Sequence, residues 1–234
     1  MTVAAIVPAA GRGERMGPGG PKALRPIAGT PMLVYAVRSL ASARSVDLVL
    51  VAAPPDDVHA VSALLVDHEL AAEVDVIAGG TTRQESVRLA LASLPADADI
   101  VLVHDAARPL APAELADDVV RAIRGGAEAV VPGAPVADTI KHIDVAGQVV
   151  RTIDRGMLRA AQTPQGFRRD VLTLAHDAAS ASTAQATDDA GLVELSGHPV
   201  VVIPGAEEAF KVTRPLDLVV AEAVLASQRS THGR

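Results

Sequence analysis

Short apolar runs without polar alternation recur along this chain, and stretches with helical periodicity lie between most of them. The first run, residues 3–8 (Val-Ala-Ala-Ile-Val-Pro), is typical of a strand that is buried on both faces of a sheet. Similar runs predict strands at residues 48–53, 74–78, 100–103, 129–131 and 200–203. Helical periodicity and start signals predict helices at residues 30–43, 56–66, 83–94 and 113–124.

This alternation predicts an α/β fold with a Rossmann-like, mostly parallel sheet and helices on both of its faces. Ligands of such sheets bind at the carboxyl ends of the strands, so functional residues are expected directly after each strand. The length of 234 residues fits a single domain of this class, which we assign to residues 1–234.

One segment, residues 136–155, interrupts the alternation, because apolar and polar residues there follow a period of two around a Val-Ala-Gly-Gln turn. We therefore predict a protruding β-hairpin arm at about residues 136–156. A two-stranded hairpin is only marginally stable in water, so its apolar face needs a partner. That partner is either the rest of the same domain or a second subunit, in which case the hairpin is the dimerisation arm of a homodimer.

The charge balance and the missing residue types exclude several classes of function. Twenty-one Lys and Arg residues against 28 Asp and Glu residues give a net charge of -7, which disfavours a nucleic-acid partner. The chain has no cysteine, and none of its seven histidines has the i, i+4 spacing of a helical zinc site. No apolar stretch approaches the roughly 18 residues of a membrane helix, and no basic leader precedes the first strand. We expect a cytoplasmic protein without a membrane partner.

A glycine-rich loop at residues 8–22 follows the first predicted strand. Its glycines allow backbone N–H groups to turn toward one centre, and Arg15 and Lys22 add positive charge, as in an anion-binding nest. A dinucleotide fingerprint would need glycine in place of Met16, and a Walker loop would need a Gly-Lys-Ser/Thr sequence, so neither motif is present. The alternative is a flexible surface loop, in which the two cations would have no role.

The segment Ala-Ala-Gly-Arg-Gly-Glu-Arg-Met-Gly at residues 9–17, together with Pro21-Lys22, resembles the signature of sugar-nucleotide pyrophosphorylase-like nucleotidyltransferases. Within that group the chain is most similar to the cytidylyltransferases that act on 2-C-methyl-D-erythritol 4-phosphate in non-mevalonate isoprenoid biosynthesis. The resemblance covers almost the whole chain, and it continues in residues 101–109, 153–155, 162–165, 187–188 and 210–215.

The resemblance implies that a phosphate oxygen of a polyol phosphate attacks the α-phosphorus of CTP and expels pyrophosphate. The attacking group is already an anion, so catalysis consists of positioning and charge neutralisation, without an enzyme nucleophile. By resemblance, Arg15 and Lys22 stabilise the transition state, and Asp105 and Lys211 complete the catalytic set. For Asp105, a salt bridge with Arg108 is the structural alternative. Triphosphate chemistry also implies Mg2+ as a cofactor, with ligands that the sequence does not identify.

The resemblance also assigns two sets of binding residues. The nucleotide-binding set is Ala9, Ala10, Gly11, Gly13, Gly79, Gly80, Thr81, Ser86 and Ala106. The set for the polyol phosphate is Asp105, Arg108, Thr139, Arg155, Thr163, Thr187 and Lys211. Thr81 departs from the resemblance, because better-known members carry an aspartate there as an acceptor for the amino group of cytosine. Thr139 and Arg155 lie on the predicted arm, which in the family reaches into the neighbouring subunit's site.

Three alternatives stay open beside this interpretation. The same transfer could act on ribitol 5-phosphate, because enzymes for that substrate share most of these motifs. A guanylyltransferase of molybdenum-cofactor assembly has a similar first loop, but it fits residues 187–188 and the arm poorly. A non-catalytic nucleotide-binding protein of the same fold would not need Arg15, Lys22, Asp105 and Lys211 together.

His104 is interpreted as structural, since an acidic phosphate nucleophile needs no general base.

Overall fold

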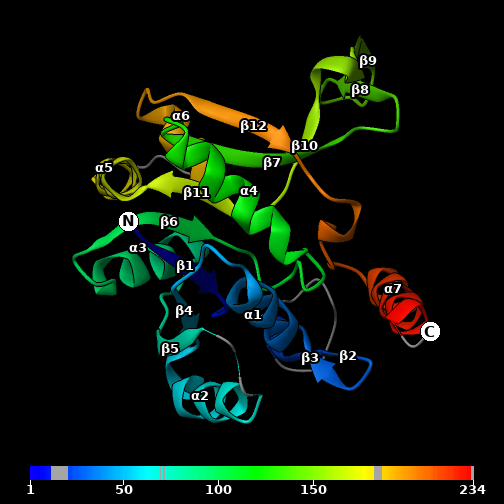
Figure 1. Cartoon of the computed structure of the whole chain (residues 1–234). Coiled ribbons are helices and arrows are strands. Elements are labelled where there is room, and N and C mark those ends of the chain that lie inside the picture. Colours follow the sequence, from blue (N-terminus) through cyan, green and yellow to red (C-terminus); the bar gives the residue numbers. More distant parts are fainter. Residues whose placement is uncertain (12–20, 69, 71, 182–185, 233–234) are drawn as a thin grey trace.

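In the computed structural model, which describes residues 1–11, 21–68, 70, 72–181 and 186–232, eight strands form a central sheet (Figure 1). The order is β10-β7-β11-β6-β1-β4-β5, and β12 pairs with β7. The strands are β1 (Thr2–Pro8), β4 (Leu48–Ala53), β5 (Glu73–Ala78), β6 (Ala98–Val103), β7 (Ala129–Pro135), β10 (Arg159–Ala161), β11 (Gln165–Arg168) and β12 (Val200–Pro204). Each strand predicted from an apolar run is present, so the predicted fold class is confirmed.

The sheet is mostly parallel, with an antiparallel part that the sequence analysis did not predict. Strands β6, β1, β4 and β5 are parallel neighbours, and β12 runs parallel to β7. The short strand β11 lies between β6 and β7 and is antiparallel to both, and β10 is antiparallel to β7. As a result, the chain after Ala161 returns to the carboxyl end of β6, where Gln165 pairs with Val103.

Helices cover both faces of the sheet, as predicted. Helices α1 (Met32–Ser42), α2 (Val58–Val66) and α4 (Ala113–Arg124) pack on the face that includes Val3, Ala5 and Val7 of β1. Helices α3 (Arg83–Ser93), α5 (Arg169–Ser180) and α6 (Asp189–Leu195) pack on the opposite face, with Ala4 and Ile6. The alternate residues of β1 therefore serve two cores, and burial of each Val or Ile side chain contributes about 1.5–3 kcal/mol.

Several element boundaries differ from the sequence prediction near prolines. The helix predicted to start at residue 30 begins at Met32, because Thr30–Pro31 forms β3, which pairs with β2 (Pro26–Ile27). The helix predicted from residue 56 is preceded by a 3-10 turn at Pro55–Asp57. Helix α7 (Pro215–His232) packs against Ile27 and Met32, outside the two main cores. In the described part of the chain, no helix is both long and apolar enough to cross a membrane.

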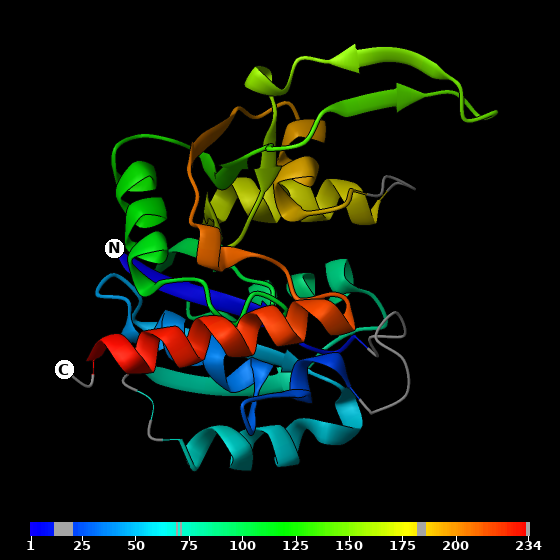
Figure 2. The same ribbon diagram turned by 90° about the vertical axis from the view of Figure 1, so that its right-hand side faces the viewer.

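The predicted hairpin is confirmed and stands apart from the central sheet (Figure 2). Its strands β8 (Ile140–Ile143) and β9 (Val149–Ile153) pair only with each other among the described residues, and Gly147 has the positive φ of 80° that the turn requires. Ile143, Val149 and Val150 are 53%, 59% and 58% exposed. These side chains are therefore not covered by the described part of their own domain, and the role of the hairpin as a dimerisation arm stays a prediction.

Candidate active site

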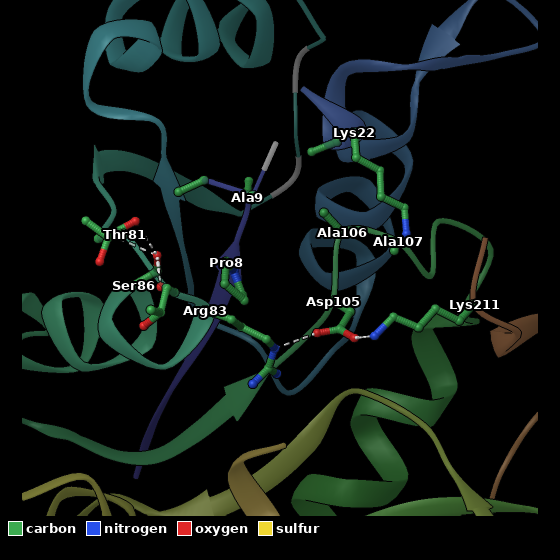
Figure 3. Close-up of a pocket in the computed structure, with 15 residues that line it drawn as sticks. Pro8, Ala9, Lys22, Thr81, Arg83, Ser86, Asp105, Ala106, Ala107 and Lys211 are labelled. Atoms are coloured by element: carbon green, nitrogen blue, oxygen red, sulfur yellow. Dashed lines mark hydrogen bonds and ion pairs between the residues drawn. The ribbon is translucent and has the colours of Figure 1, made fainter. Parts of the chain in front are cut away.

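A cavity of about 250 Å3 opens where β1, β5 and β6 end, at the carboxyl edge of the parallel strands. This is the place predicted for a ligand site in a sheet of this kind. Figure 3 shows Thr81 and Ser86 at one side of the cavity and Lys22 and Lys211 at the other. The lining residues are Pro8, Ala9, Ala10, Gly11, Lys22, Ala23, Gly80, Thr81, Thr82, Arg83, Ser86, Asp105, Ala106, Ala107 and Lys211.

Most of the predicted nucleotide-binding residues line this one cavity. Those residues are Ala9, Ala10, Gly11, Gly80, Thr81, Ser86 and Ala106. Gly79 lies against Ala10, since a Cβ on Gly79 would approach the Ala10 Cβ to 2.8 Å. The predicted residues Gly13 and Arg15 lie outside the described residues, so their roles stay predictions.

The turn from β5 into α3 is fixed by two hydroxyl groups. Thr82 is the N-cap of α3, because its side chain accepts a hydrogen bond from Glu85 N–H at 3.0 Å. The buried Ser86 hydroxyl accepts a hydrogen bond from Gly80 N–H at 3.0 Å and donates one to the Thr82 carbonyl at 2.9 Å. These contacts hold Gly80 and Thr81 against the cavity.

Asp105 lies two residues after the end of β6 and binds two cations that both line the cavity. Its Oδ1 is 3.0 Å from Arg83 Nε, and its Oδ2 is 2.6 Å from Lys211 Nζ (Figure 3). Burial by itself would raise the pKa of Asp105, but the charges of Arg83 and Lys211 outweigh it and hold that pKa well below its usual range. The structural alternative of an Asp105–Arg108 salt bridge is wrong, because Arg83 and Lys211 occupy both carboxylate oxygens.

Arg83 extends this cluster into the interior, and the sequence analysis missed it. Its Nη1 is 2.7 Å from Oδ2 of Asp189, which is 1% exposed, and Asp189 Oδ1 is 3.0 Å from His176 Nε2. Burial would lower the pKa of Arg83, yet Asp189 and Asp105 together raise it above its ordinary value. Arg83 therefore stays charged in the wall of the cavity and links Asp105 to the buried Asp189.

His104 and Thr163 form a buried network behind Asp105. Thr163 Oγ1 accepts a hydrogen bond from Asp105 N–H at 3.0 Å and lies 3.0 Å from His104 Nδ1. His104 Nε2 lies 3.2 Å from the Arg108 carbonyl, which can only accept, so the neutral ring carries its proton on Nε2 and accepts from Thr163 on Nδ1. Burial lowers the pKa of His104 to about 4. These contacts support the interpretation of His104 as structural.

The predicted residues for the polyol phosphate do not all meet in the cavity. Asp105 and Lys211 line it, whereas Thr163 lies behind Asp105 and is 4% exposed. Arg108 donates hydrogen bonds to the carbonyls of Ala209 at 2.6 Å and Ala161 at 2.9 Å, so it connects the segment before Lys211 to β10.

The other three predicted residues are exposed and lie outside the cavity lining. Thr139 precedes β8, and Arg155 follows β9 and donates to the Ala137 carbonyl across the base of the arm. Thr187 precedes Asp188, the N-cap of α6.

A protein-family model described as 2-C-methyl-D-erythritol 4-phosphate cytidylyltransferase matches residues 3–227 of the chain. The chain belongs to this cytidylyltransferase family. A relative of that name from Streptomyces avermitilis is 56% identical over 238 residues, which cover 98% of this chain and 94% of the relative. A relative of the same name from Frankia casuarinae is 58% identical, over 96% of this chain and 81% of its own length.

Solved structures agree with the assignment to the cytidylyltransferase family. The crystal structure of 2-C-methyl-D-erythritol 4-phosphate cytidylyltransferase from Thermus thermophilus is 35% identical, with a TM-score of 0.76 and coverage of 96% of this chain and 98% of that chain. The structure of 4-diphosphocytidyl-2C-methyl-D-erythritol synthase from Anaerococcus prevotii is 27% identical, with a TM-score of 0.85 and coverage of 96% of both chains. The resemblance identified in the sequence motifs is thereby confirmed.

Proposed function

We propose that this protein transfers a cytidylyl group from CTP to 2-C-methyl-D-erythritol 4-phosphate, forming 4-diphosphocytidyl-2-C-methyl-D-erythritol and pyrophosphate. The observation that carries the proposal is the family match over residues 3–227. The cavity supports it independently, because a polar turn lies on one side and cationic side chains lie on the other (Figure 3). A nucleotide needs both, the first for its base and the second for its phosphates. We also propose that the protein acts in the cytoplasm.

In the proposed reaction, a phosphate oxygen of the polyol phosphate forms a bond to the α-phosphorus of CTP. The bond from that phosphorus to the bridging oxygen of the β-phosphate breaks, and pyrophosphate leaves with the electron pair. Negative charge accumulates on the pentavalent phosphorus, so nearby fixed cations accelerate the step. Lys22, Lys211 and Arg83 all line the cavity and can supply this charge.

Asp105 acts on the reaction through Lys211. The lysine side chain is 42% exposed, and its Nζ is held at 2.6 Å from Asp105 Oδ2 at the edge of the cavity. A lysine held by a carboxylate loses less conformational freedom when it binds a phosphate, which is one form of preorganisation. We propose that Asp105 positions Lys211 and also accepts a hydroxyl group of the polyol.

We propose that Mg2+ enters with CTP. Among the described residues, no group of three His, Cys, Asp or Glu side chains could hold a metal ion. The carboxylate in the cavity lining, Asp105, is already bound to two cations. This donor set fits a hard ion that takes most of its ligands from phosphate and water, and Asp105 is the carboxylate in the cavity lining that could hold it. When bound, Mg2+ would neutralise phosphate charge and favour the leaving of pyrophosphate.

We further propose that two copies of the chain form a homodimer through the arm. The exposed apolar side chains of β8 and β9 support this, because a two-stranded hairpin with an uncovered apolar face is not stable by itself. In the dimer, Thr139 and Arg155 would bind the polyol phosphate in the partner's site, beside Arg108, Thr163 and Thr187. The arm variant Val150→Asp should then lower both dimerisation, measured by sedimentation, and turnover. An equally active monomer would contradict this arrangement.

The function is tested by pyrophosphate release from the purified protein with Mg2+ and each nucleoside triphosphate in turn. Methylerythritol phosphate and ribitol 5-phosphate are offered in parallel as acceptors. Turnover with CTP and methylerythritol phosphate is the expected result. Activity with ribitol 5-phosphate alone would show that the protein is a cytidylyltransferase for that substrate instead. Nucleotide binding without turnover for any pair would favour the alternative of a non-catalytic nucleotide-binding protein.

A further inference from the structure

Glu85 contacts both polar groups of Thr81 at the edge of the cavity. The Oε2 atom of Glu85 accepts one hydrogen bond from Thr81 N–H at 2.7 Å and another from Thr81 Oγ1 at 2.7 Å. Thr81 lines the cavity, whereas Glu85 lies on the first turn of α3 and is not among the lining residues. The carboxylate therefore contacts the cavity lining through its hydrogen bonds to Thr81.

The surrounding turn is shaped to allow this contact. A Cβ on Gly80 would lie 2.2 Å from Cγ of Glu85, so a side chain at position 80 would displace the glutamate. Thr82 holds the backbone N–H of Glu85 at 3.0 Å. In an ordinary capping box, the glutamate would reach only the backbone N–H of the N-cap residue, here Thr82. The additional bond to the Thr81 hydroxyl is not part of a capping box.

A threonine hydroxyl has one proton to donate and two lone pairs with which to accept. Normally it rotates to suit its neighbour, so it does not distinguish a donor from an acceptor. The hydrogen bonds from the Thr81 side chain and backbone lower the pKa of Glu85, so its carboxylate is ionised and can only accept. The Thr81 proton is thus committed to Glu85, and Oγ1 offers only lone pairs to a ligand.

An oxygen that can only accept distinguishes the two pyrimidines. Cytosine presents an amino donor at position 4, whereas a 4-keto pyrimidine such as uracil presents a carbonyl acceptor at the same place. The amino group can donate to Thr81 Oγ1, but a carbonyl there would face another lone pair without a proton between them. Thr81 is exposed in the free protein, and a base that binds against it would cover Oγ1. A site that leaves such a covered polar group unpaired discriminates against the wrong ligand.

We propose that Glu85 determines the choice of CTP over UTP, by holding the Thr81 hydroxyl as a hydrogen-bond acceptor for the base. Glu85 is a positioning residue in this arrangement, because it acts through Thr81. The inference rests on the proposed function, which places the base of the nucleotide at Gly80 and Thr81.

The test is the ratio of kcat/KM for CTP to kcat/KM for UTP in wild type and in Glu85→Met. Both hydrogen bonds from Thr81 end on the same carboxylate oxygen, so a glutamine could keep them through its carbonyl oxygen. Methionine removes the acceptor and frees the threonine proton to turn toward a carbonyl. We expect the CTP/UTP ratio to fall about tenfold or more, because one hydrogen bond then changes its direction. The ratio is unaffected by the folded fraction of a variant, so it separates base choice from loss of the helix cap.

Matched variants keep the test decisive. Thr81→Val, which removes the hydroxyl but keeps the shape, should lower the ratio as Glu85→Met does, and Thr81→Ser should keep it. Glu114→Met makes the same change in the first turn of α4, at an exposed position outside the cavity lining, and should leave both rates unchanged. If turnover of a variant is too slow, calorimetric binding of CTP and UTP gives the ratio instead.

The outcomes separate this inference from the proposed function. A wild type that turns over CTP but not UTP, with a reduced ratio in Glu85→Met, supports both. If the wild type discriminates and Glu85→Met lowers the two rates equally, Glu85 is only a helix cap and the inference is overturned while the function stands. Equal use of CTP and UTP by the wild type would also overturn it. A wild type without cytidylyl transfer contradicts the proposed function itself.

Discussion

Replacement of Arg83 by methionine tests whether the charged cluster holds the site together. The substitution keeps much of the apolar stem of the side chain but removes the guanidinium between Asp105 and Asp189. Asp105 keeps Lys211 as a partner at 2.6 Å. Asp189, which is 1% exposed, keeps only His176 as an ion-pair partner among the described residues.

The expected cost follows from the burial of Asp189. Removal of one partner from a buried ion pair costs about 3–5 kcal/mol, because the remaining charge is left uncompensated. The side chain of Arg83 is 32% exposed and water can reach part of it, so we expect the lower end, about 3 kcal/mol. For a chain of this length, that corresponds to a decrease in Tm of roughly 6–12 °C.

Urea unfolding at about pH 7, followed by circular dichroism, measures the change, with Arg121→Met as the control. Arg121 pairs with Asp118 at 2.6 Å on the surface, where both side chains are largely exposed, and its loss should cost less than about 0.5 kcal/mol. A cost below about 1 kcal/mol in Arg83→Met would refute the reasoning.

The same variant makes a prediction about pH. In the wild type, Arg83 helps to keep the pKa of Asp189 below its ordinary value, against the effect of burial. Without Arg83, burial raises this pKa above the unfolded value, so the charged form destabilises the fold as pH rises through it. The loss in free energy of unfolding of Arg83→Met, relative to wild type, should therefore be greatest near neutral pH and smaller at about pH 5.

Three further predictions concern other parts of the site and core. Lys22→Ala should lower turnover about 100- to 1000-fold, from roughly 1.4 kcal/mol per decade, and a steady-state rate within about threefold of wild type would remove it from the catalytic set. His104 has a folded pKa of about 4 against an ordinary 6.5, so stability is retained above about pH 6.5 and decreases toward pH 4 by up to about 1.4 kcal/mol per pH unit. His104→Gln should flatten that slope in urea titrations, and an unchanged slope would contradict the assignment. Gly166→Ala would place a Cβ 2.2 Å from Val119 Cγ1 in the core, and it should cost about 1–3 kcal/mol in the same titration; a neutral effect would show that α4 can shift.

Elements with a strong local pattern could be predicted from the sequence. Strand β4 at Leu48–Ala53 and helix α4 at Ala113–Arg124 have the predicted bounds, because a continuous apolar run and a clear helical period each fix a local structure. Strands β10 and β11 were not predicted, since they are only three and four residues long and include Arg159 and Gln165. Their pairing with β6 and β7 depends on the fold rather than on local sequence.

The residues of the site also divide into those that local sequence motifs predict and those whose contacts depend on the fold. The motifs placed Ala10, Thr81 and Asp105 at one cavity, because each follows a strand of the same parallel sheet. The sequence pattern identifies Arg83 only as the first residue of a helix. Its partners Asp105 and Asp189 lie 22 and 106 positions away, so no local spacing indicates the contacts. The contact of Glu85 with Thr81 could have been suspected from the capping sequence Thr82-Arg83-Gln84-Glu85, but the direction of a hydroxyl proton is not encoded in any spacing.

The long separations within the charged cluster also bear on how the protein folds. Lys211 meets Asp105 across 106 positions, so two of the cations in the cavity are brought together only after the C-terminal third has returned to the sheet. Contacts this distant along a chain form late, because the entropy of loop closure must be overcome first. A ligand that binds this cluster in the native state but not in the unfolded chain stabilises the complete fold by mass action, so the free energy of unfolding depends on the ligand concentration.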